Sequence, residues 1–146
     1  MSVQVRVPRL VAVTEPFDLS STYIHLGSNS TAMPLPDFQW TKEYLESYAA
    51  RIAGDGTEGR LVAIIAQRET WDSWERHPQG AEVVVLLSGR VDLIQEIDGA
   101  EVIVALHPGQ AAINPTNVWH RSVVHEPGDA LFITPGAGTE HRPYSP

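Results

Sequence analysis

One stretch of the sequence, residues 74–89, decides the fold of this chain; it reads WERHPQGAEVVVLLSG. Glu75 and His77 are two residues apart, so in a β-strand their side chains point to the same face. The Pro-Gln-Gly sequence that follows predicts a turn. Glu82 then opens an apolar run of strand length. A hairpin over this stretch therefore brings Glu75, His77 and Glu82 close to one point.

A second stretch, residues 109–120, supplies a fourth polar side chain; it reads GQAAINPTNVWH and ends at His120. Two carboxylates and two imidazoles suit a divalent metal ion, so we expect a metal site made of Glu75, His77, Glu82 and His120. Carboxylate oxygens favour Mn, Fe or Ni and imidazole also suits Zn, which leaves the metal's identity open. Without a metal, two carboxylates this close repel, and we expect one of them to hold a proton.

Each of these residues also has an interpretation without metal. A single strand histidine is more often structural than a ligand, and Glu75 fits a solvated carboxylate at a strand end. Glu82 begins an apolar strand, where an unpaired charge is costly to bury, and an arginine such as Arg90 or Arg121 is the alternative partner. The remaining histidines lie outside both stretches and are treated as non-ligands: His25, His107, His125 and His141.

Residues 75–89 resemble the first sequence motif of the cupin family. That motif has His-x-His, then three or four residues, Glu, six residues and Gly. Here Glu75-x-His77 is followed by four residues, Glu82, six residues and Gly89. One position departs from the motif, because Glu75 replaces the first histidine. This departure changes the metal shell that the resemblance implies.

Residues 109–120 resemble the second cupin motif, which has Gly, five residues, Pro-x-Gly, two residues and His. Here Gly109 is followed by five residues, Pro115-x-Asn117, two residues and His120. Asn117 replaces a glycine at little cost, because Asn tolerates a positive φ. The resemblance implies a double-stranded β-helix, or jelly-roll barrel. It also implies chemistry that includes metal-dependent dioxygenases, isomerases and decarboxylases.

The rest of the sequence is also typical of an all-β protein. Short apolar runs separated by Pro-Gly and Asp-Gly turns fill residues 59–135, which predicts an antiparallel barrel core. The preceding residues 1–58 predict strands at 3–13 and 22–26, a loop at 27–36 and a helix at 38–53. Residues 136–146 are a Gly- and Pro-rich tail that we expect on the surface. We therefore predict a single domain over residues 1–146, an antiparallel jelly roll with one N-terminal helix.

Aromatic side chains near the motifs are candidates for binding a substrate. We assign this role to Trp74, beside Glu75; packing at the barrel rim is the alternative for Trp74 and Trp71. Trp119 precedes His120, so its side chain should point to the other face. The predicted helix also has an aromatic stripe, which either packs against the barrel or forms a lid or a partner surface.

Composition restricts the partners of this protein. Its net charge is −8, from 10 basic and 18 acidic residues, and no basic stripe is present to neutralise phosphates. This argues against binding nucleic acid and, more weakly, an anionic membrane surface. The absence of cysteine excludes a disulfide and a zinc–thiolate site. No apolar signal core or run of transmembrane length is present, so the cytoplasm is the expected location.

The predicted site favours a metal-dependent protein that acts on a small molecule in the barrel cavity, with catalytic residues unknown. The alternatives are a non-catalytic module that binds a small metabolite, with or without metal, and a metal-free relic of the fold. The sequence contains neither a nucleophilic triad nor a Gly-rich phosphate loop. We also expect a homodimer, with strand 3–13 helping to form the interface, because residues 83–87 are apolar on both strand faces. The outer face needs cover from strand 3–13, the helix or a second subunit.

Overall fold

The computed structural model describes residues 15–146, so the predicted strand at residues 3–13 lies outside the described part. The helical elements are α1 (Lys42–Ile52) and two 3₁₀ segments, η1 (Ser28–Ser30) and η2 (Ala53–Glu58). The strands are β1 (Tyr23–Leu26), β2 (Ala32–Leu35), β3 (Arg60–Gln67), β4 (Ser73–Arg76), β5 (Glu82–Leu86), β6 (Arg90–Ile97), β7 (Ala100–Leu106), β8 (Ala111–Asn114), β9 (His120–Glu126), β10 (Gly128–Pro135) and β11 (Glu140–Pro143).

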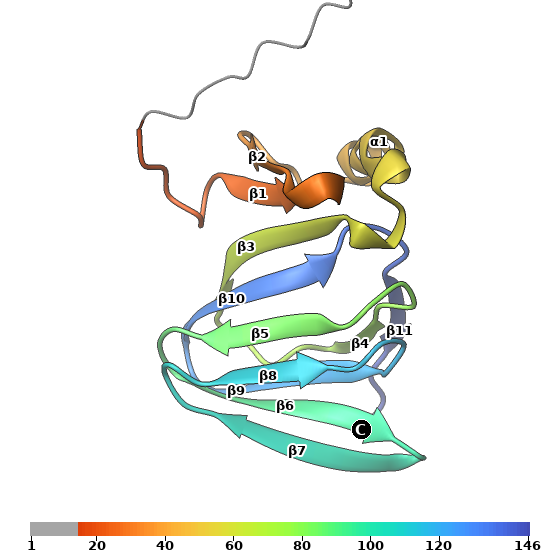
Figure 1. Cartoon of the computed structure of the whole chain (residues 1–146). Coiled ribbons are helices and arrows are strands. Elements are labelled where there is room, and N and C mark those ends of the chain that lie inside the picture. The colour runs from red at the N-terminus through yellow and green to blue at the C-terminus, as the bar shows by residue number, and fades with distance from the viewer. Residues whose placement is uncertain (1–14) are drawn as a thin grey trace, which may run out of the picture.

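These strands form two antiparallel sheets (Figure 1). The order is β2-β1-β3-β10-β5-β8 in one sheet and β11-β4-β9-β6-β7 in the other. Several neighbours are distant in sequence, since β10 lies between β3 and β5, and β9 lies between β4 and β6. Antiparallel strands crossing between two sheets in this way form a jelly roll. The predicted fold class is therefore confirmed.

The interior of the barrel is filled by apolar side chains from both sheets. Burial alternates along β5, which places Glu82 on the same inner face as Val84 and Leu86. Leu93 of β6 and Phe132 of β10 belong to the same buried cluster as Val84 and Leu86. The hydrophobic core thus fixes the strand that carries Glu82, and it sets the direction in which that carboxylate points.

The segment before β3 covers one side of the barrel (Figure 1). The helix α1 begins after Thr41, whose hydroxyl accepts a hydrogen bond from the Tyr44 amide at 3.2 Å. Tyr48 and Ile52 are its buried residues and form a second apolar cluster with Leu61 of β3. The predicted helix is confirmed; Tyr48 and Ile52 of the predicted stripe pack against the barrel, whereas Trp40 and Leu45 are exposed. Among residues 15–146, no helix is both long and apolar enough to cross a membrane.

Two segments differ from the sequence-based expectation. The predicted loop at residues 27–36 contains β2, which pairs with β1 at the edge of its sheet. An edge position tolerates Pro34, which has no N–H to donate. The predicted surface tail at residues 136–146 contains β11, which pairs with β4. Both strands are short and rich in polar or Gly/Pro neighbours, so their periodicity is weak, and pairing with distant partners determines them.

Two turns depend on backbone conformations that few residues adopt. Gly89 has a φ of 84°, as its place between β5 and β6 predicts, and Asn117 has a φ of 62° at the position of the missing motif glycine. A Cβ atom at Gly89 would also contact the backbone carbonyl of Glu126. Gly89 thus fixes the turn at the end of β5 opposite Glu82, and Asn117 fixes the turn before β9, whose first residue is the predicted ligand His120.

Candidate metal centre

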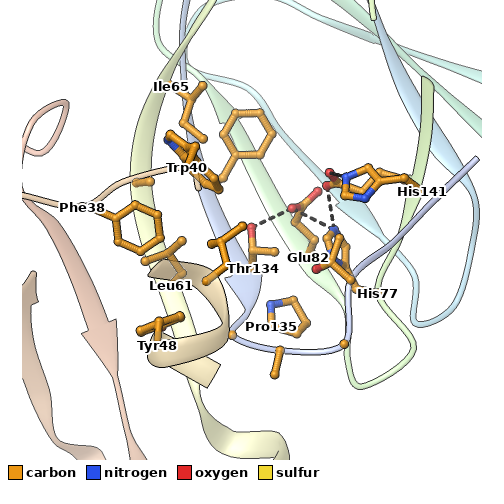
Figure 2. A pocket seen from close by; sticks show the side chains of 18 of the residues that line it. Phe38, Trp40, Tyr48, Leu61, Ile65, His77, Glu82, Thr134, Pro135 and His141 are labelled. Carbon is orange, nitrogen blue, oxygen red and sulfur yellow. Dashed lines mark hydrogen bonds and ion pairs between the residues drawn. The ribbon is translucent and has the colours of Figure 1, made fainter. Parts of the chain in front are cut away.

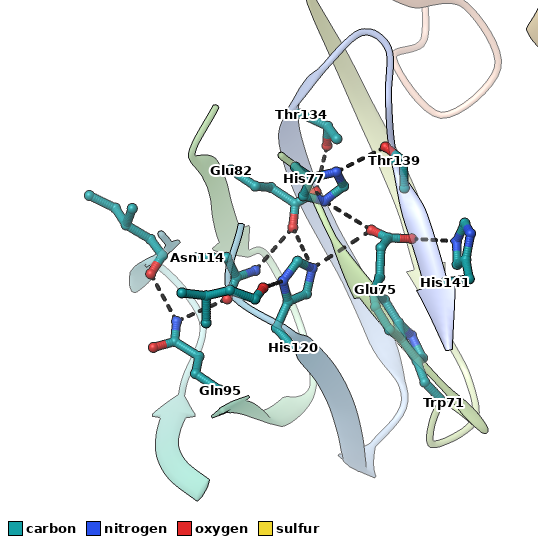
Figure 3. A network of polar contacts seen from close by, with 12 residues as sticks. Trp71, Glu75, His77, Glu82, Gln95, Asn114, His120, Thr134, Thr139 and His141 are labelled. Atoms are coloured by element: carbon teal, nitrogen blue, oxygen red, sulfur yellow. Dashed lines mark hydrogen bonds and ion pairs between the residues drawn. The ribbon is translucent and has the colours of Figure 1, made fainter. Parts of the chain in front are cut away.

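The four predicted ligands converge at one place in the structure (Figure 3). Glu75 lies on β4 and is paired in register with His120, the first residue of β9. His77 follows the end of β4, and Glu82 is the first residue of β5. One ligand atom from each of the four residues lies within 4.8 Å of the other three. The predicted hairpin is wrong, because β4 and β5 lie in different sheets and do not pair. The turn between these strands and the second motif still bring the four side chains together.

Distances within this group match those between ligands of one ion. Nε2 of His77 lies 3.1 Å from Glu75 Oε1 and 3.1 Å from Glu82 Oε2. Nε2 of His120 lies 3.3 Å from Glu82 Oε1 and 3.7 Å from Glu75 Oε1. Ligand atoms about 2.1 Å from a shared ion lie about 3.0 Å apart in an octahedron and about 3.4 Å apart in a tetrahedron. The group thus has the spacing that a divalent ion requires.

The two imidazoles also point as metal ligands do. Nε2 of His77 and Nε2 of His120 are buried and have no partner in hydrogen-bond geometry, although carboxylate oxygens lie nearby. Buried polar atoms without partners are costly. Nitrogens and oxygens that crowd one point without pairing are better satisfied by a cation between them. The donor set and its geometry therefore fit a divalent metal.

Further contacts hold the imidazole rings in place. Nδ1 of His120 lies 3.1 Å from the carbonyl oxygen of Val118, to which it donates, so the neutral ring carries its lone pair on Nε2. Nδ1 of His77 contacts the Thr139 hydroxyl at 2.9 Å. Such outer contacts orient ligating histidines and fix their tautomer. Both rings therefore present Nε2 to the centre of the group.

Glu82 is held by neutral polar groups rather than by an arginine. Its two oxygens accept hydrogen bonds from the Asn114 amide at 3.0 Å and the Thr134 hydroxyl at 2.7 Å. Gln95 continues the network by donating to Asn114 Oδ1 at 2.9 Å. Arg121, one of the alternative partners, instead lies over the Tyr144 ring at 3.7 Å. The negative charge of Glu82 is therefore left to be balanced by the imidazoles of His77 and His120.

His141 is one of the residues of this site that sequence reasoning missed. It lies on β11, and its Nε2 is 3.0 Å from Glu75 Oε2, the oxygen that does not face the other ligands. Nothing in the sequence motifs marks this position, because β11 reaches β4 through long-range pairing. The other histidines lie apart, as expected: His25 contacts Tyr48 and Asp55, and His125 contacts Asp92.

The charges within the group differ from the sequence-based expectation. Burial disfavours the charged form of Glu82, but contacts with His120 and His77 outweigh burial and lower the pKa of this carboxyl to about 2. The same balance holds the pKa of Glu75 well below its usual range. Burial opposes the charged imidazoles too, yet Glu75 and Glu82 raise the pKa values of His77 and His120 to about 9. The prediction that a carboxylate holds a proton is therefore wrong, because the adjacent imidazoles bind protons more tightly.

A cavity of about 680 Å³ opens beside this group (Figure 2). Glu75, His77 and Glu82 line it at one end. Apolar and aromatic side chains line much of the remainder, among them Phe38, Trp40, Leu45, Leu61, Trp71 and Phe132. A cavity of this size accommodates a small molecule in contact with the candidate ligands.

The structure places Trp71, rather than Trp74, on the cavity. Trp74 is 5% exposed and does not line the cavity; alternation along β4 turns it to the face opposite Glu75. On that face the guanidinium carbon of Arg142 lies over the Trp74 ring, 5.1 Å from the ring centroid. The substrate-binding role assigned to Trp74 is therefore not supported by its position. Trp119 points away from the group as expected and lies 4.5 Å below the guanidinium of Arg76.

Comparison with known proteins assigns the family. Residues 61–134, just over half of the chain, match the sequence profile of the cupin domain. This chain belongs to the cupin family. No curated protein matches the sequence.

Solved structures of other proteins are similar over part of the chain. A cupin-2 domain containing protein from Shewanella frigidimarina is 18% identical, with a TM-score of 0.45 over 52% of this chain and 70% of that one. Hydroquinone 1,2-dioxygenase from a Sphingomonas species, with 4-hydroxybenzoate bound, is 15% identical, with a TM-score of 0.43 over 51% of this chain and 58% of that one. Oxalate decarboxylase from Bacillus subtilis, which has Mn(II) centres, is 16% identical, with a TM-score of 0.49 over 65% of this chain and 26% of that one. These likenesses describe the fold alone.

Proposed function

We propose that this protein is a divalent-metal enzyme that acts on a small molecule in the barrel cavity. One observation carries the proposal: the four candidate ligand atoms lie within 4.8 Å of one another, and three of their residues line a cavity of about 680 Å³. A molecule in the cavity can therefore reach the ion directly. A structural metal site would instead be closed on all sides by protein.

The ion would be held by Glu75, His77, Glu82 and His120. Two carboxylates and two imidazoles suit Mn, Fe, Ni or Zn. When bound, such an ion supplies Lewis-acid chemistry or activates oxygen or water. Dioxygenase, isomerase and decarboxylase reactions all fall within that chemistry.

The surrounding residues orient the ligands and handle protons. Val118 and Thr139 hold the two imidazoles through Nδ1, which leaves Nε2 for the ion. His141 contacts the outer oxygen of Glu75 and also lines the cavity, with a side chain that is 60% exposed. Glu75 raises the pKa of this imidazole. His141 is therefore placed to hold a proton between Glu75 and a molecule in the cavity, as a general acid or base does.

The alternative function is a non-catalytic module that binds a small metabolite. The largely apolar lining of the cavity favours it, because such a surface binds ligands whether or not a metal is present. Turnover separates the two functions, since a binding module leaves its ligand unchanged.

The test is the metal content of protein purified without added metal, and again after equal exposure to Mn, Fe, Ni and Zn. We expect about one ion per chain, since the four residues form one site. His77→Ala and His120→Ala should each lose most of it. His125→Ala is the matched control, because His125 contacts Asp92 outside the group. Oxygen-uptake and turnover assays then follow on the loaded protein. A wild type that stays empty with all four metals, or variants that bind as well as wild type, would favour the cavity-binding module.

A further inference from the structure

The cavity has two chemically different ends (Figure 2). Glu82, His77 and His141 lie at the polar end, and Phe38 and Tyr48 lie at the opposite, apolar end. A molecule that spans the cavity must therefore carry its polar atoms at one end and apolar surface at the other.

No Lys or Arg side chain lines the cavity within the described residues 15–146. The basic groups at the polar end are the exposed imidazole of His141 and the buried imidazole of His77, and both already contact Glu75. Two nearby arginines are occupied by acidic partners: Arg76 pairs with Glu140, and Arg142 pairs with Glu96 at 2.7 Å. An anionic group in the cavity would thus lack the charged hydrogen bonds by which carboxylates and phosphates are usually bound.

The metal group supplies no net positive charge either. The negative charges of Glu75 and Glu82 balance those of a divalent ion, whereas a shell of neutral ligands would leave the ion's charge uncompensated. An anion that enters would lose its hydration at a site whose net charge is zero. The cavity therefore disfavours anions, while an uncharged molecule loses little.

Two apolar side chains at the cavity are unusually exposed. Trp40 is 57% exposed and Leu45 is 39% exposed, although both line the cavity. Burying such side chains against a ligand is favourable in proportion to the apolar area removed from water. Phe38 and Trp71 add flat rings to the same lining, which suits a planar partner.

We propose that the cavity selects an uncharged, planar and mostly apolar molecule that carries one or two adjacent oxygen donors. The oxygen donors face Glu75, His77 and Glu82, and the apolar body lies against Trp40, Phe38 and Trp71. The orientation of the molecule, with its oxygen donors toward the candidate ligands, rests on the proposed metal function. Its lack of charge and its apolar body rest on the lining alone.

Much of the apolar end comes from the segment before the barrel. Phe38, Trp40, Leu45 and Tyr48 all precede residues 61–134, the part that matches the cupin profile. Selectivity for the apolar body therefore depends in large part on the segment before residue 61, with Trp71 as the contribution of the barrel. The candidate ligands, in contrast, all lie within the matching part.

Calorimetric titration with two matched probes tests this selectivity. Ortho-hydroxyacetophenone and salicylate share one ring and one pair of neighbouring oxygen donors, but salicylate carries a negative charge. Zinc-loaded protein and chelator-treated, metal-free protein are each titrated with both probes. We expect the neutral probe to bind at least about ten-fold more tightly in both states, because the imidazoles at the polar end already contact Glu75 and Glu82 and leave no free cation for the anion.

Variants then test the two ends separately. Trp40→Ala should weaken binding of the neutral probe at least about five-fold through lost apolar contact, with zinc content unchanged. Leu45→Lys adds a cation to the lining and should reduce the affinity ratio of the neutral probe to salicylate. Ala50→Lys adds the same charge to an exposed position of α1 outside the lining, and it should leave this ratio unchanged.

Several results would overturn the inference: salicylate binding as tightly as the neutral probe, no effect of Trp40→Ala, or no detectable binding of the neutral probe. If wild type holds no zinc while metal-free protein keeps both the neutral preference and its dependence on Trp40, the proposed metal function fails and this inference stands.

Discussion

Glu75 on β4 lies directly opposite His120 on β9 in the antiparallel ladder, with Oε1 and Nε2 3.7 Å apart. This register joins the two sequence motifs at the level of the backbone. A slip of one residue would turn one of these side chains to the other face of the sheet. The arrangement of Glu75 and His120 is therefore a property of strand pairing, and not of loops that adjust after the barrel forms.

Glu75 should act as a ligand, so Glu75→Ala should lose as much bound metal as His77→Ala. Glu75→His restores the commoner cupin motif and should retain a metal, because imidazole suits the same ions. Metal content after equal exposure to Mn, Fe, Ni and Zn checks both variants. If Glu75→Ala keeps most of the wild-type metal, Glu75 is a neighbour of the ion and not a ligand.

His141 should strengthen metal binding without contacting the ion. His141→Ala removes the contact that orients the Glu75 carboxylate, and loss of such an outer contact typically weakens metal affinity roughly 10- to 100-fold. Competition titrations with a chromophoric chelator measure the affinity. His107→Ala is the control, because His107 is exposed and follows β7 away from the group. Equal affinities for the two variants would contradict this role.

Metal-free protein should lose stability as the pH rises from about 6.5 to about 9. His77 and His120 have pKa values raised from 6.5 to about 9, so their imidazolium forms stabilise the fold fully below 6.5, and this contribution is lost as the pH passes 9. Glu82 has its pKa lowered from 4.5 to about 2, so its contribution is lost as the pH falls through that range. Urea denaturation of chelator-treated protein at a series of pH values measures both the alkaline and the acidic loss of stability.

Metal affinity should rise between about pH 6.5 and 9, where the stability of the metal-free protein falls. The ion requires neutral imidazoles, so binding releases protons below about pH 9 and strengthens as the pH rises toward that value.

The stability of the metal-free protein has its own control. The double variant of His77→Gln and His120→Gln should show a flatter stability profile between pH 6.5 and 9. A wild-type denaturation midpoint that rises over this interval would be inconsistent with protonated imidazoles.

Gly89 should be less replaceable than Gly99, although both have a positive φ. A Cβ atom at Gly89 would meet the backbone of Glu126 and Pro127, whereas one at Gly99 would meet nothing within 4 Å. Gly89→Ala should therefore destabilise the protein by roughly 1–3 kcal/mol more than Gly99→Ala. Thermal denaturation compares the two variants, and equal melting temperatures would show that the close approach at Gly89 relaxes freely.

A homodimer remains our prediction, now with a specific surface. Cross-strand pairs place apolar side chains side by side on the outer face of the six-stranded sheet: Val62, Ile64, Val83, Val85, Ile113, Leu131 and Ile133. Ile113, which is 62% exposed, offers a test with little effect on folding. Light scattering at tens of micromolar should give a dimer mass for wild type and a monomer mass for Ile113→Glu. A monomeric wild type would refute this.

Sequence alone predicted the parts of this protein that follow from local pattern. The spacing of Glu75, His77 and Glu82 depends on strand alternation and one turn, and the structure keeps it. Trp74 neighbours Glu75 in the sequence, but alternation along β4 turns its side chain to the opposite face, away from the cavity.

The outer contacts of the site were beyond sequence reasoning. Thr139 and His141 reach His77 and Glu75 because β11 pairs with β4, and no periodicity marks that short, Gly- and Pro-flanked strand. Asn114 reaches Glu82 through the register of β8 with β5. Such contacts depend on long-range strand pairing, which a single sequence does not encode in any local window.

The candidate ligands come from both halves of the barrel. Glu82 lies in the six-stranded sheet, whereas Glu75 and His120 lie in the five-stranded sheet. An ion that binds all of them acts as a cross-link between the sheets, in a chain that has no cysteine to form one. Binding to the folded state alone adds stability in proportion to the logarithm of metal concentration. Amide hydrogen exchange in β4 and β5 should accordingly be the first to quicken when a chelator removes the metal, as the two sheets begin to separate at that seam.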